Sequence, residues 1–122
     1  MSYQGMLKED SLKDKVIIVT GGGTGLGKSM TKYFLELGAK VVITSRKEEV
    51  LQKTKDELEK LTGGSLHYVV GDVRNVDDVN VTIDSTISKF GRIDALLNNA
   101  AGNFISPTEN LSTKAFDTVV DI

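Results

Sequence analysis

The chain has 122 residues, no cysteine and a formal net charge of −2. This length is sufficient for one domain with its own core, and the lack of cysteine excludes disulfides, thiolate catalysis and cysteine-bound metal. The small negative charge gives no electrostatic reason to expect nucleic acid or a membrane surface as a partner. No apolar run approaches the roughly 20 residues of a membrane-spanning helix, and we expect no metal site.

The first 14 residues are polar and are predicted to form an arm over the surface, which leaves residues 15–122 as the domain proper. The arm lacks the hydrophobic stretch of a secretory signal, and the first arginine is Arg46, which argues against an arginine-rich transit segment. The carboxyl end, residues 120–122 (VDI), is not a peroxisomal address. We therefore expect a cytoplasmic protein.

Short β-branched runs alternate with amphipathic segments along the domain. Strands are predicted over residues 16–20, 40–44, 66–70 and 93–97. Helices are predicted over residues 26–37, 48–61, 76–90 and, after a loop, 113–122. Asn75 is the expected N-cap of the third helix. Glycines at positions 38, 63 and 91 follow the ends of the first three helices, as is typical of helix termination.

Each of the first three predicted helices carries a stripe of side chains at helical spacing, which we expect to face the core. The stripes are Leu26, Met30, Phe34 and Leu37; Leu51, Thr54, Leu58 and Leu61; and Val79, Ile83, Ile87 and Phe90. Nearly continuous apolar strands between such helices predict an α/β fold, a Rossmann-type doubly wound parallel sheet.

Right-handed crossovers give this sheet the order 3-2-1-4 and place a ligand at the carboxyl ends of the first and fourth strands. If the sheet stops at the fourth strand, residues 95–97 form an unpaired edge. We therefore expect the isolated polypeptide to be marginally stable and to associate.

The most informative stretch is the glycine-rich turn between the first strand and the first helix. Glycine lets the chain turn sharply and lets a ligand approach the backbone, and the free N–H groups of the following helical turn favour an anion. In a strand–turn–helix context this pattern predicts that the turn binds the pyrophosphate of a nucleotide. The predicted cofactor-binding residues of the turn are Gly21, Gly22, Gly23, Thr24, Gly25, Leu26 and Gly27.

The end of the second strand favours NADP(H) over NAD(H). An acidic residue there would bind the 2′-hydroxyl of the adenosine ribose, whereas an arginine pairs with a 2′-phosphate. Residues 44–47 read TSRK, and no acid occurs before Glu48. The alternative is that Arg46 and Lys47 are ordinary solvated residues, but cations are poorly placed at a helix N-terminus unless an anion binds there.

Two more polar segments end strands on the same side of the sheet. Asp72 could accept from the adenine amino group while Val73 packs on the ring, although Asp72 could also be a simple turn residue. Residues 98–102 (NNAAG) end the fourth strand, where Asn99 and Ala100 would lie close to the cofactor. Asparagine side chains there could also tie adjacent loops together.

These motifs together resemble the short-chain dehydrogenase/reductase family over about residues 12–122. The resemblance is carried by the glycine spacing T-G-x-x-x-G-x-G from Thr20 to Gly27, by Asp72-Val73 and by residues 98–102. A narrower similarity, to the 2,4-dienoyl-CoA reductases, is carried by residues 20–28, 45–47 and 100–109.

The resemblance implies NADPH-dependent reduction of a conjugated acyl-CoA, with a homo-oligomeric full-length parent. By position, Arg46, Arg74, Phe104 and Ser112 would match acyl-CoA contacts, and Asn103 would match the catalytic residue that orients the substrate. From the residues alone, Phe104 could simply be packed in a loop and Ser112 could be a helix N-cap. His67, within a predicted strand, is interpreted as structural.

The chain departs from the family because members run to about twice this length and carry a serine, a tyrosine and a lysine in their second half. The tyrosines here, Tyr3, Tyr33 and Tyr68, do not stand four residues before a lysine at the nicotinamide end. We therefore interpret the chain as the cofactor-binding half of an oxidoreductase, truncated before the catalytic half and inactive alone. The alternatives are another short-chain reductase acting on oxoacyl, sugar or steroid groups, and a non-catalytic nucleotide-binding module.

Overall fold

The structure, a computed structural model, describes residues 11–23, 25–99 and 104–107. Its strands are β1 (Val16–Thr20), β2 (Lys40–Ser45), β3 (Leu66–Val70), β4 (Ala95–Asn98) and β5 (Phe104–Pro107). Its helices are α1 (Gly25–Glu36), α2 (Glu48–Thr62) and α3 (Val76–Phe90). None of the helices within these ranges has the length and apolar character needed to span a bilayer.

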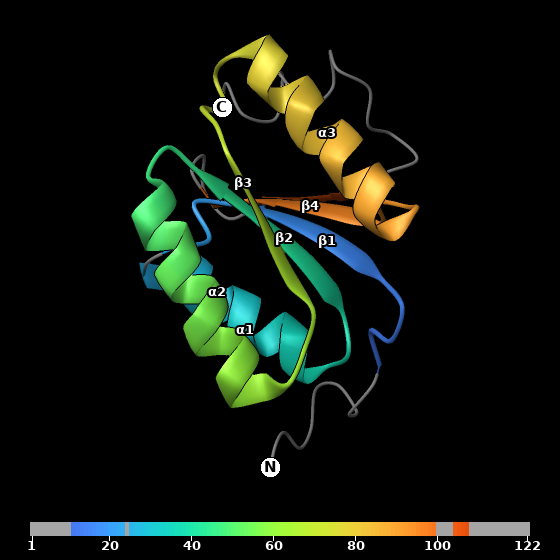
Figure 1. The fold of residues 1–122 in the computed structure, drawn as a ribbon. Helices are drawn as coiled ribbons and strands as arrows, with labels where there is room; N and C mark the ends of the chain where they lie inside the picture. The colour runs from blue at the N-terminus through green and yellow to red at the C-terminus, as the bar shows by residue number, and fades with distance from the viewer. Residues whose placement is uncertain (1–10, 24, 100–103, 108–122) are drawn as a thin grey trace.

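The five strands form one sheet in the order β3-β2-β1-β4-β5. The first four strands pair in parallel, which confirms the predicted order 3-2-1-4. In Figure 1, α1 and α2 lie on one face of the sheet and α3 lies on the other, as in a doubly wound fold. The carboxyl ends of the parallel strands therefore meet at one edge, and the turn into each helix starts there.

The prediction of an open edge at residues 95–97 is wrong for this structure. β5 pairs antiparallel with β4, and the register places Leu96 opposite Ser106 and Leu97 opposite Ile105. The sequence predicts a loop for the residues of β5, but a short β-favouring segment can turn back and pair with the free N–H and C=O groups of a strand edge. The pairing removes the argument that the edge of β4 drives association.

The core has one cluster on each face of the sheet. The larger cluster, between the sheet and the α1/α2 layer, contains the buried residues Ile17, Val19, Phe34, Leu35, Ala39, Val41, Ile43, Leu51, Leu58, Leu66 and Leu97. The smaller cluster, beneath α3, contains Ile18, Val42, Val69, Val79 and Leu96. Successive residues of a strand belong to the two clusters in turn, because their side chains point to opposite faces of the sheet.

Three residues of the predicted helical stripes face solvent instead of the core. Leu26, Leu61 and Ile87 are 52%, 62% and 45% exposed. Threonines take part of the buried faces of α1 and α3, where their hydroxyls donate to the carbonyl four residues earlier, as Thr31 does to Gly27 at 2.8 Å. A pattern built mainly on apolar residues misses such positions, because the intrahelical bond satisfies the hydroxyl that would otherwise oppose burial.

The predicted termini of the first three helices agree with the structure to within one residue. The Asn75 side chain caps α3 by accepting from the backbone N–H groups of Asp77 and Asp78. Gly63 and Gly91 close α2 and α3 in the left-handed conformation.

The described part of the predicted arm, residues 11–14, forms a turn against the domain. The Leu12 backbone N–H donates to the Leu37 carbonyl at 2.9 Å, and its side chain packs against the larger core cluster. The rest of the predicted arm, residues 1–10, and the predicted helix over residues 113–122 lie outside the described residues.

Candidate nucleotide-binding site

The glycine-rich turn links β1 to α1 at the carboxyl edge of the sheet. Gly21 has φ +67°, a conformation that other residues rarely adopt. A Cβ at Gly27, in the first turn of α1, would lie only 2.1 Å from the Gly21 carbonyl oxygen. The two backbones therefore touch, and only glycine at position 27 permits this close approach.

The turn is also packed from below by β2 and α2. A Cβ at Gly22 would lie 2.3 Å from Ile43 Cγ2, and one at Gly23 would lie 2.8 Å from Val50 Cγ1. The Thr54 hydroxyl donates to the Gly23 carbonyl at 2.7 Å. Side chains of β2 and α2 thus support the inner side of the turn, and the glycines add no side chains of their own.

Two asparagines at the end of β4 connect that strand to β1 and to the turn. The buried Thr20 hydroxyl donates to Asn98 Oδ1 at 2.9 Å, and Asn99 Nδ2 donates to the Gly21 carbonyl at 3.4 Å. These contacts join adjacent segments in the manner expected of the asparagines. They fix the point where the sheet order reverses, which is where open α/β sheets bind ligands.

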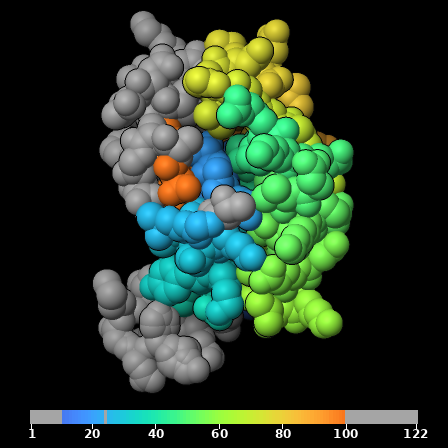
Figure 2. Space-filling view, turned by 90° about the vertical axis from the view of Figure 1, so that its left-hand side faces the viewer, coloured from blue at the N-terminus to red at the C-terminus, as the bar shows by residue number. Residues whose placement is uncertain are grey.

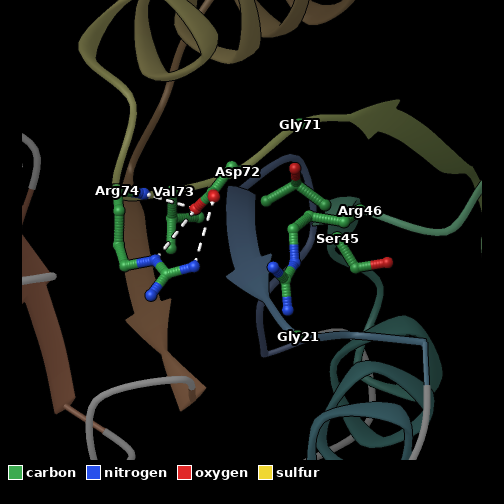
Figure 3. Close-up of a pocket in the computed structure, with 8 residues that line it drawn as sticks. Gly21, Ser45, Arg46, Gly71, Asp72, Val73 and Arg74 are labelled. Carbon is green, nitrogen blue, oxygen red and sulfur yellow. Dashed lines mark hydrogen bonds and ion pairs between the residues drawn. The ribbon is translucent and has the colours of Figure 1, made fainter.

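A pocket of about 380 Å³ opens at the ends of β2 and β3, beside the turn. Figure 2 looks onto this edge of the sheet, where blue atoms near the end of β1 lie recessed between the green and yellow surfaces. The close-up in Figure 3 shows the guanidinium groups of Arg46 and Arg74 in this pocket. Its lining residues are Gly21, Thr44, Ser45, Arg46, Gly71, Asp72, Val73 and Arg74.

An ion pair forms one wall of this pocket. Asp72 Oδ1 accepts from the Arg74 backbone N–H at 2.9 Å and from Arg74 Nε at 3.3 Å (Figure 3). These bonds, the backbone bond foremost, hold the pKa of the Asp72 carboxyl below its ordinary value. The Asp72 backbone N–H in turn donates to Asp78 Oδ2 of α3 at 2.8 Å, so α3 fixes this wall.

A second hollow, of about 280 Å³, lies between the turn and the start of α2. It shares Gly21, Ser45 and Arg46 with the first pocket and adds Gly23, Lys47 and Val50. Lys47 is the N-cap residue of α2 and makes no side-chain cap hydrogen bond. The first N–H groups of α2 therefore lack a capping side chain where two cationic residues gather, an arrangement that favours an anion.

Thr44, at the end of β2, has a buried hydroxyl that lacks a hydrogen-bond partner among the described residues. It is 1% exposed and lines the first pocket. A buried polar group without a partner is costly in a native fold. The hydroxyl therefore indicates a polar ligand or an ordered water at the floor of this pocket.

The structure brings most of the predicted site residues to one edge of the sheet. These are Gly21, Gly22, Gly23, Gly25, Leu26, Gly27, Arg46, Asp72, Val73, Arg74 and Asn99. Thr24, Ala100, Asn103 and Ser112 lie outside the described residues, and Phe104 is described only as the first residue of β5. The role of each residue toward a ligand stays a prediction.

Sequence reasoning missed Thr44, Val50 and the contact of Thr54 with the turn. Thr44 lies two residues before the basic segment, Arg46 and Lys47, so its position was available from the sequence. Val50 and Thr54 could not be assigned to the site, because their contacts depend on how α2 lies across the turn.

His67, interpreted as structural, bonds through Nε2 to Ser85 Oγ at 3.0 Å, and its ring packs edge-on against Phe90.

The fold and this edge define a Rossmann-type nucleotide-binding domain: a glycine turn at a switch point, a basic strand end beside it, and a polar pocket. The family model for short chain dehydrogenases matches residues 15–122. The chain belongs to this family, whose members bind a nicotinamide nucleotide.

Individual relatives match this chain over less than half of their own length. A probable 2,4-dienoyl-CoA reductase 3 from Caenorhabditis elegans is 46% identical over 96% of this chain and 38% of its own. A crystal structure of a short chain dehydrogenase from Bacillus anthracis is 49% identical, with a TM-score of 0.69 over 91% of this chain and 44% of its own. L-sorbose reductase from Gluconobacter frateurii, complexed with NADPH and L-sorbose, is 26% identical, with a TM-score of 0.70 over 84% of this chain and 39% of its own.

The residues at this edge fit a nicotinamide dinucleotide. A Cβ at Gly22 would lie 2.3 Å from Ile43 Cγ2, and one at Gly27 would lie 2.1 Å from the Gly21 carbonyl oxygen, so only glycines let the turn pack this tightly beside the pocket. The orphan hydroxyl of Thr44 offers a further polar partner at the pocket floor. In the described ranges, no group of three or more His, Cys, Asp or Glu side chains is arranged to hold a metal ion.

Proposed function

We propose that this chain is the cofactor-binding part of an NADP(H)-dependent oxidoreductase. The observation that carries the proposal is the basic end of β2, where Arg46 lines both hollows and Lys47 lies beside it. The first carboxylate after the strand, Glu48, accepts a hydrogen bond from the Tyr68 hydroxyl at 3.2 Å. A 2′-phosphate would therefore meet two cations and the uncapped start of α2.

Each part of the cofactor has a counterpart among the residues of this edge. The glycine turn from Gly21 to Gly27 would hold the diphosphate, and Arg46 would bind the 2′-phosphate. Asp72 and Val73 would bind the adenine, and Asn99 and Ala100 are proposed as further cofactor contacts. The NADPH complex of L-sorbose reductase, a relative of the same fold, supports this choice of cofactor. The nicotinamide supplies a hydride when the cofactor is bound.

For the substrate we propose an unsaturated acyl-CoA, supported by the name of the C. elegans relative, a probable 2,4-dienoyl-CoA reductase. Arg46, Arg74, Phe104 and Ser112 would contact it, and Asn103 would orient it. Arg74 is an exposed cation in the wall of the larger pocket, able to meet a phosphate. The tyrosine and lysine that the family uses as proton donor and partner have no match here, so we expect cofactor binding without turnover.

A fluorescence titration of NADPH against NADH tests the choice of cofactor. We expect the wild type to bind NADPH at least about tenfold more tightly, since one charge-assisted phosphate contact is worth about 1.5–3 kcal/mol. Arg46→Ala should remove most of this preference. Lys60→Ala is the control, because it removes one exposed cation from the last turn of α2, away from the site. Equal affinity of the wild type for the two cofactors would contradict the proposal.

A second experiment tests the acyl-CoA and the missing proton donor together. The chain is mixed with NADPH and a 2,4-dienoyl-CoA, and NADPH absorbance is followed beside a titration of acyl-CoA binding. We expect the acyl-CoA to bind more weakly to Arg74→Ala than to the wild type, with no NADPH consumed by either. Consumption of NADPH would show that the chain is catalytically complete. Preference for a ketone or sugar substrate over the acyl-CoA would favour another short-chain reductase.

A further inference from the structure

Thr54 connects the second turn of α2 to the glycine turn. Its side chain is 2% exposed, and its hydroxyl donates to the Gly23 carbonyl at 2.7 Å across a separation of 31 residues. This contact is not needed for the helix, because residues 48–62 form α2 with the usual backbone bonds. It is instead the point at which α2 holds the backbone of the turn.

The bond of Thr54 differs from those of the other threonines in the described helices. Thr31, Thr62, Thr82 and Thr86 each donate to the carbonyl four residues earlier in their own helix. Thr54 instead directs its hydroxyl out of α2 to the turn. Four of these hydroxyls thus form a hydrogen bond within their own helix, and the hydroxyl of Thr54 bonds to another segment.

The bond fixes the orientation of one peptide group in the glycine turn. Gly23 lacks a side chain that would restrict it, so its peptide group can rotate unless something holds it. Thr54 holds the carbonyl oxygen toward the buried interface with α2, and Val50 packs at the same position. A carbonyl rotated toward the ligand would present a partial negative charge to an anion, which would oppose phosphate binding.

We infer that Thr54 is a positioning residue that holds the glycine turn in the conformation that receives the cofactor diphosphate. This inference rests on the proposed function. Thr54 makes no contact with the cofactor itself and acts through Gly23. Its effect should therefore be confined to ligands that carry a diphosphate.

The test compares two ligands across matched variants of the 122-residue chain. NADPH carries the diphosphate, whereas adenosine 2′-monophosphate carries only the 2′-phosphate. Thr54→Val removes the hydroxyl at nearly constant volume, Thr54→Ser keeps a hydroxyl, and Thr86→Val makes the same change at a fully buried position of α3. Affinities are measured by calorimetry, and folding is checked by circular dichroism.

We expect Thr54→Val to weaken NADPH about tenfold, the fold-change for one buried hydrogen bond, and to leave adenosine 2′-monophosphate within about twofold. Thr54→Ser and Thr86→Val should bind both ligands like the wild type. If Thr54→Val does not fold, Thr54→Ala against Thr54→Ser provides the same comparison at smaller volume.

Two results overturn the inference, and they differ from failure of the proposed function. The positioning role is wrong if the hydroxyl-free variants bind NADPH like the wild type, or if both ligands weaken equally. The proposed function is wrong if Arg46→Ala leaves the affinity for adenosine 2′-monophosphate unchanged, or if the wild type binds neither ligand. In that last case the inference fails with it.

Discussion

The two faces of the sheet are built differently. The α1/α2 face carries the larger core cluster, and both of its helices approach the glycine turn. The α3 face carries a smaller cluster. Each face also buries two threonines of its helices, Thr31 and Thr54 on the first and Thr82 and Thr86 on the second. One face is therefore the larger apolar layer, and the other is thinner.

This difference extends to the candidate site. The glycine turn and the basic segment are held from the α1/α2 face through Ile43, Val50 and Thr54. The pocket wall formed by Asp72, which we propose binds the adenine, is held from the α3 face because the Asp72 backbone N–H donates to Asp78. We therefore expect the phosphate region to be the rigid part of the site and the adenine region to depend on polar contacts.

The largest expected effect is at Gly27. Gly27→Ala places a Cβ 2.1 Å from the Gly21 carbonyl oxygen. Because the Cβ has no rotamer to move into and the oxygen belongs to the backbone, the turn must move. We expect a loss of at least about 3 kcal/mol in the free energy of unfolding and no measurable NADPH binding. Denaturant unfolding and fluorescence titration measure the two effects.

The control for this change is Gly91→Ala at the end of α3, where a Cβ meets open space and only the positive φ of 81° is strained. It should cost about 1–2 kcal/mol and leave NADPH affinity intact. An equal loss of NADPH affinity in the two variants would show that the glycine turn has no particular role in binding.

Leu96 and Leu97 compare the two faces directly, since these adjacent residues of β4 are both fully buried and point to opposite clusters. We expect Leu97→Ala to cost about 4 kcal/mol and Leu96→Ala about 2–3 kcal/mol, within the usual range for such truncations. The smaller cluster can relax around its cavity more easily. Urea unfolding of both variants decides the point, and a larger loss for Leu96→Ala would reverse the ranking of the faces.

Asp94 provides a pH-dependent contribution at the start of β1. Its Oδ2 accepts from the Val16 backbone N–H at 2.8 Å. Burial opposes the charge, but the bonds from Arg92 and Val16 outweigh it and lower the pKa of the Asp94 carboxyl. A lowered folded-state pKa means that the stabilisation is complete above the unfolded value of about 4 and is lost as the pH falls through the folded value.

Asp94→Asn should therefore cost about 1 kcal/mol at pH 7, and the difference from the wild type should shrink in acid. Unfolding of both proteins between neutral pH and pH 3 measures this change. The exposed Asp84→Asn serves as the control. A difference that grows on acidification would give the shift the opposite sign.

The smallest effect is expected at Ile87, which the apolar spacing placed in the core and the structure leaves 45% exposed. Ile87→Gln should change the free energy of unfolding by no more than about 0.5 kcal/mol, as at other surface positions. A loss of several kcal/mol in the free energy of unfolding, measured in a thermal or denaturant melt, would indicate that Ile87 is buried.

The sequence predicted the fold well where local signals and burial agree. β1, β3 and α3 have the predicted bounds, because β-branched runs, the Asn75 cap and the closing glycines mark them independently of tertiary contacts. β5 was missed, because its pairing depends on a free edge of β4 that only the assembled sheet provides.

The candidate site was predictable in its parts and not in its support. Glycine spacing and the basic residues Arg46 and Lys47 predict a phosphate-binding region from residue type alone. The bond from Thr54 to Gly23, 31 residues apart, depends on how α2 is placed against the turn. The sequence predicts Thr54 only as a member of the stripe of α2 that faces the core. Its burial confirms this prediction, and its hydroxyl has the additional role of bonding to the turn.

Amide hydrogen exchange with and without NADPH tests the central claim most directly. We predict that NADPH slows exchange in residues 21–27 and 44–47, with a smaller effect in residues 71–74, and leaves the far ends of α2 and α3 unchanged. Protection confined to other parts of the chain, or none at saturating NADPH, would contradict the assignment of this edge of the sheet as the cofactor site.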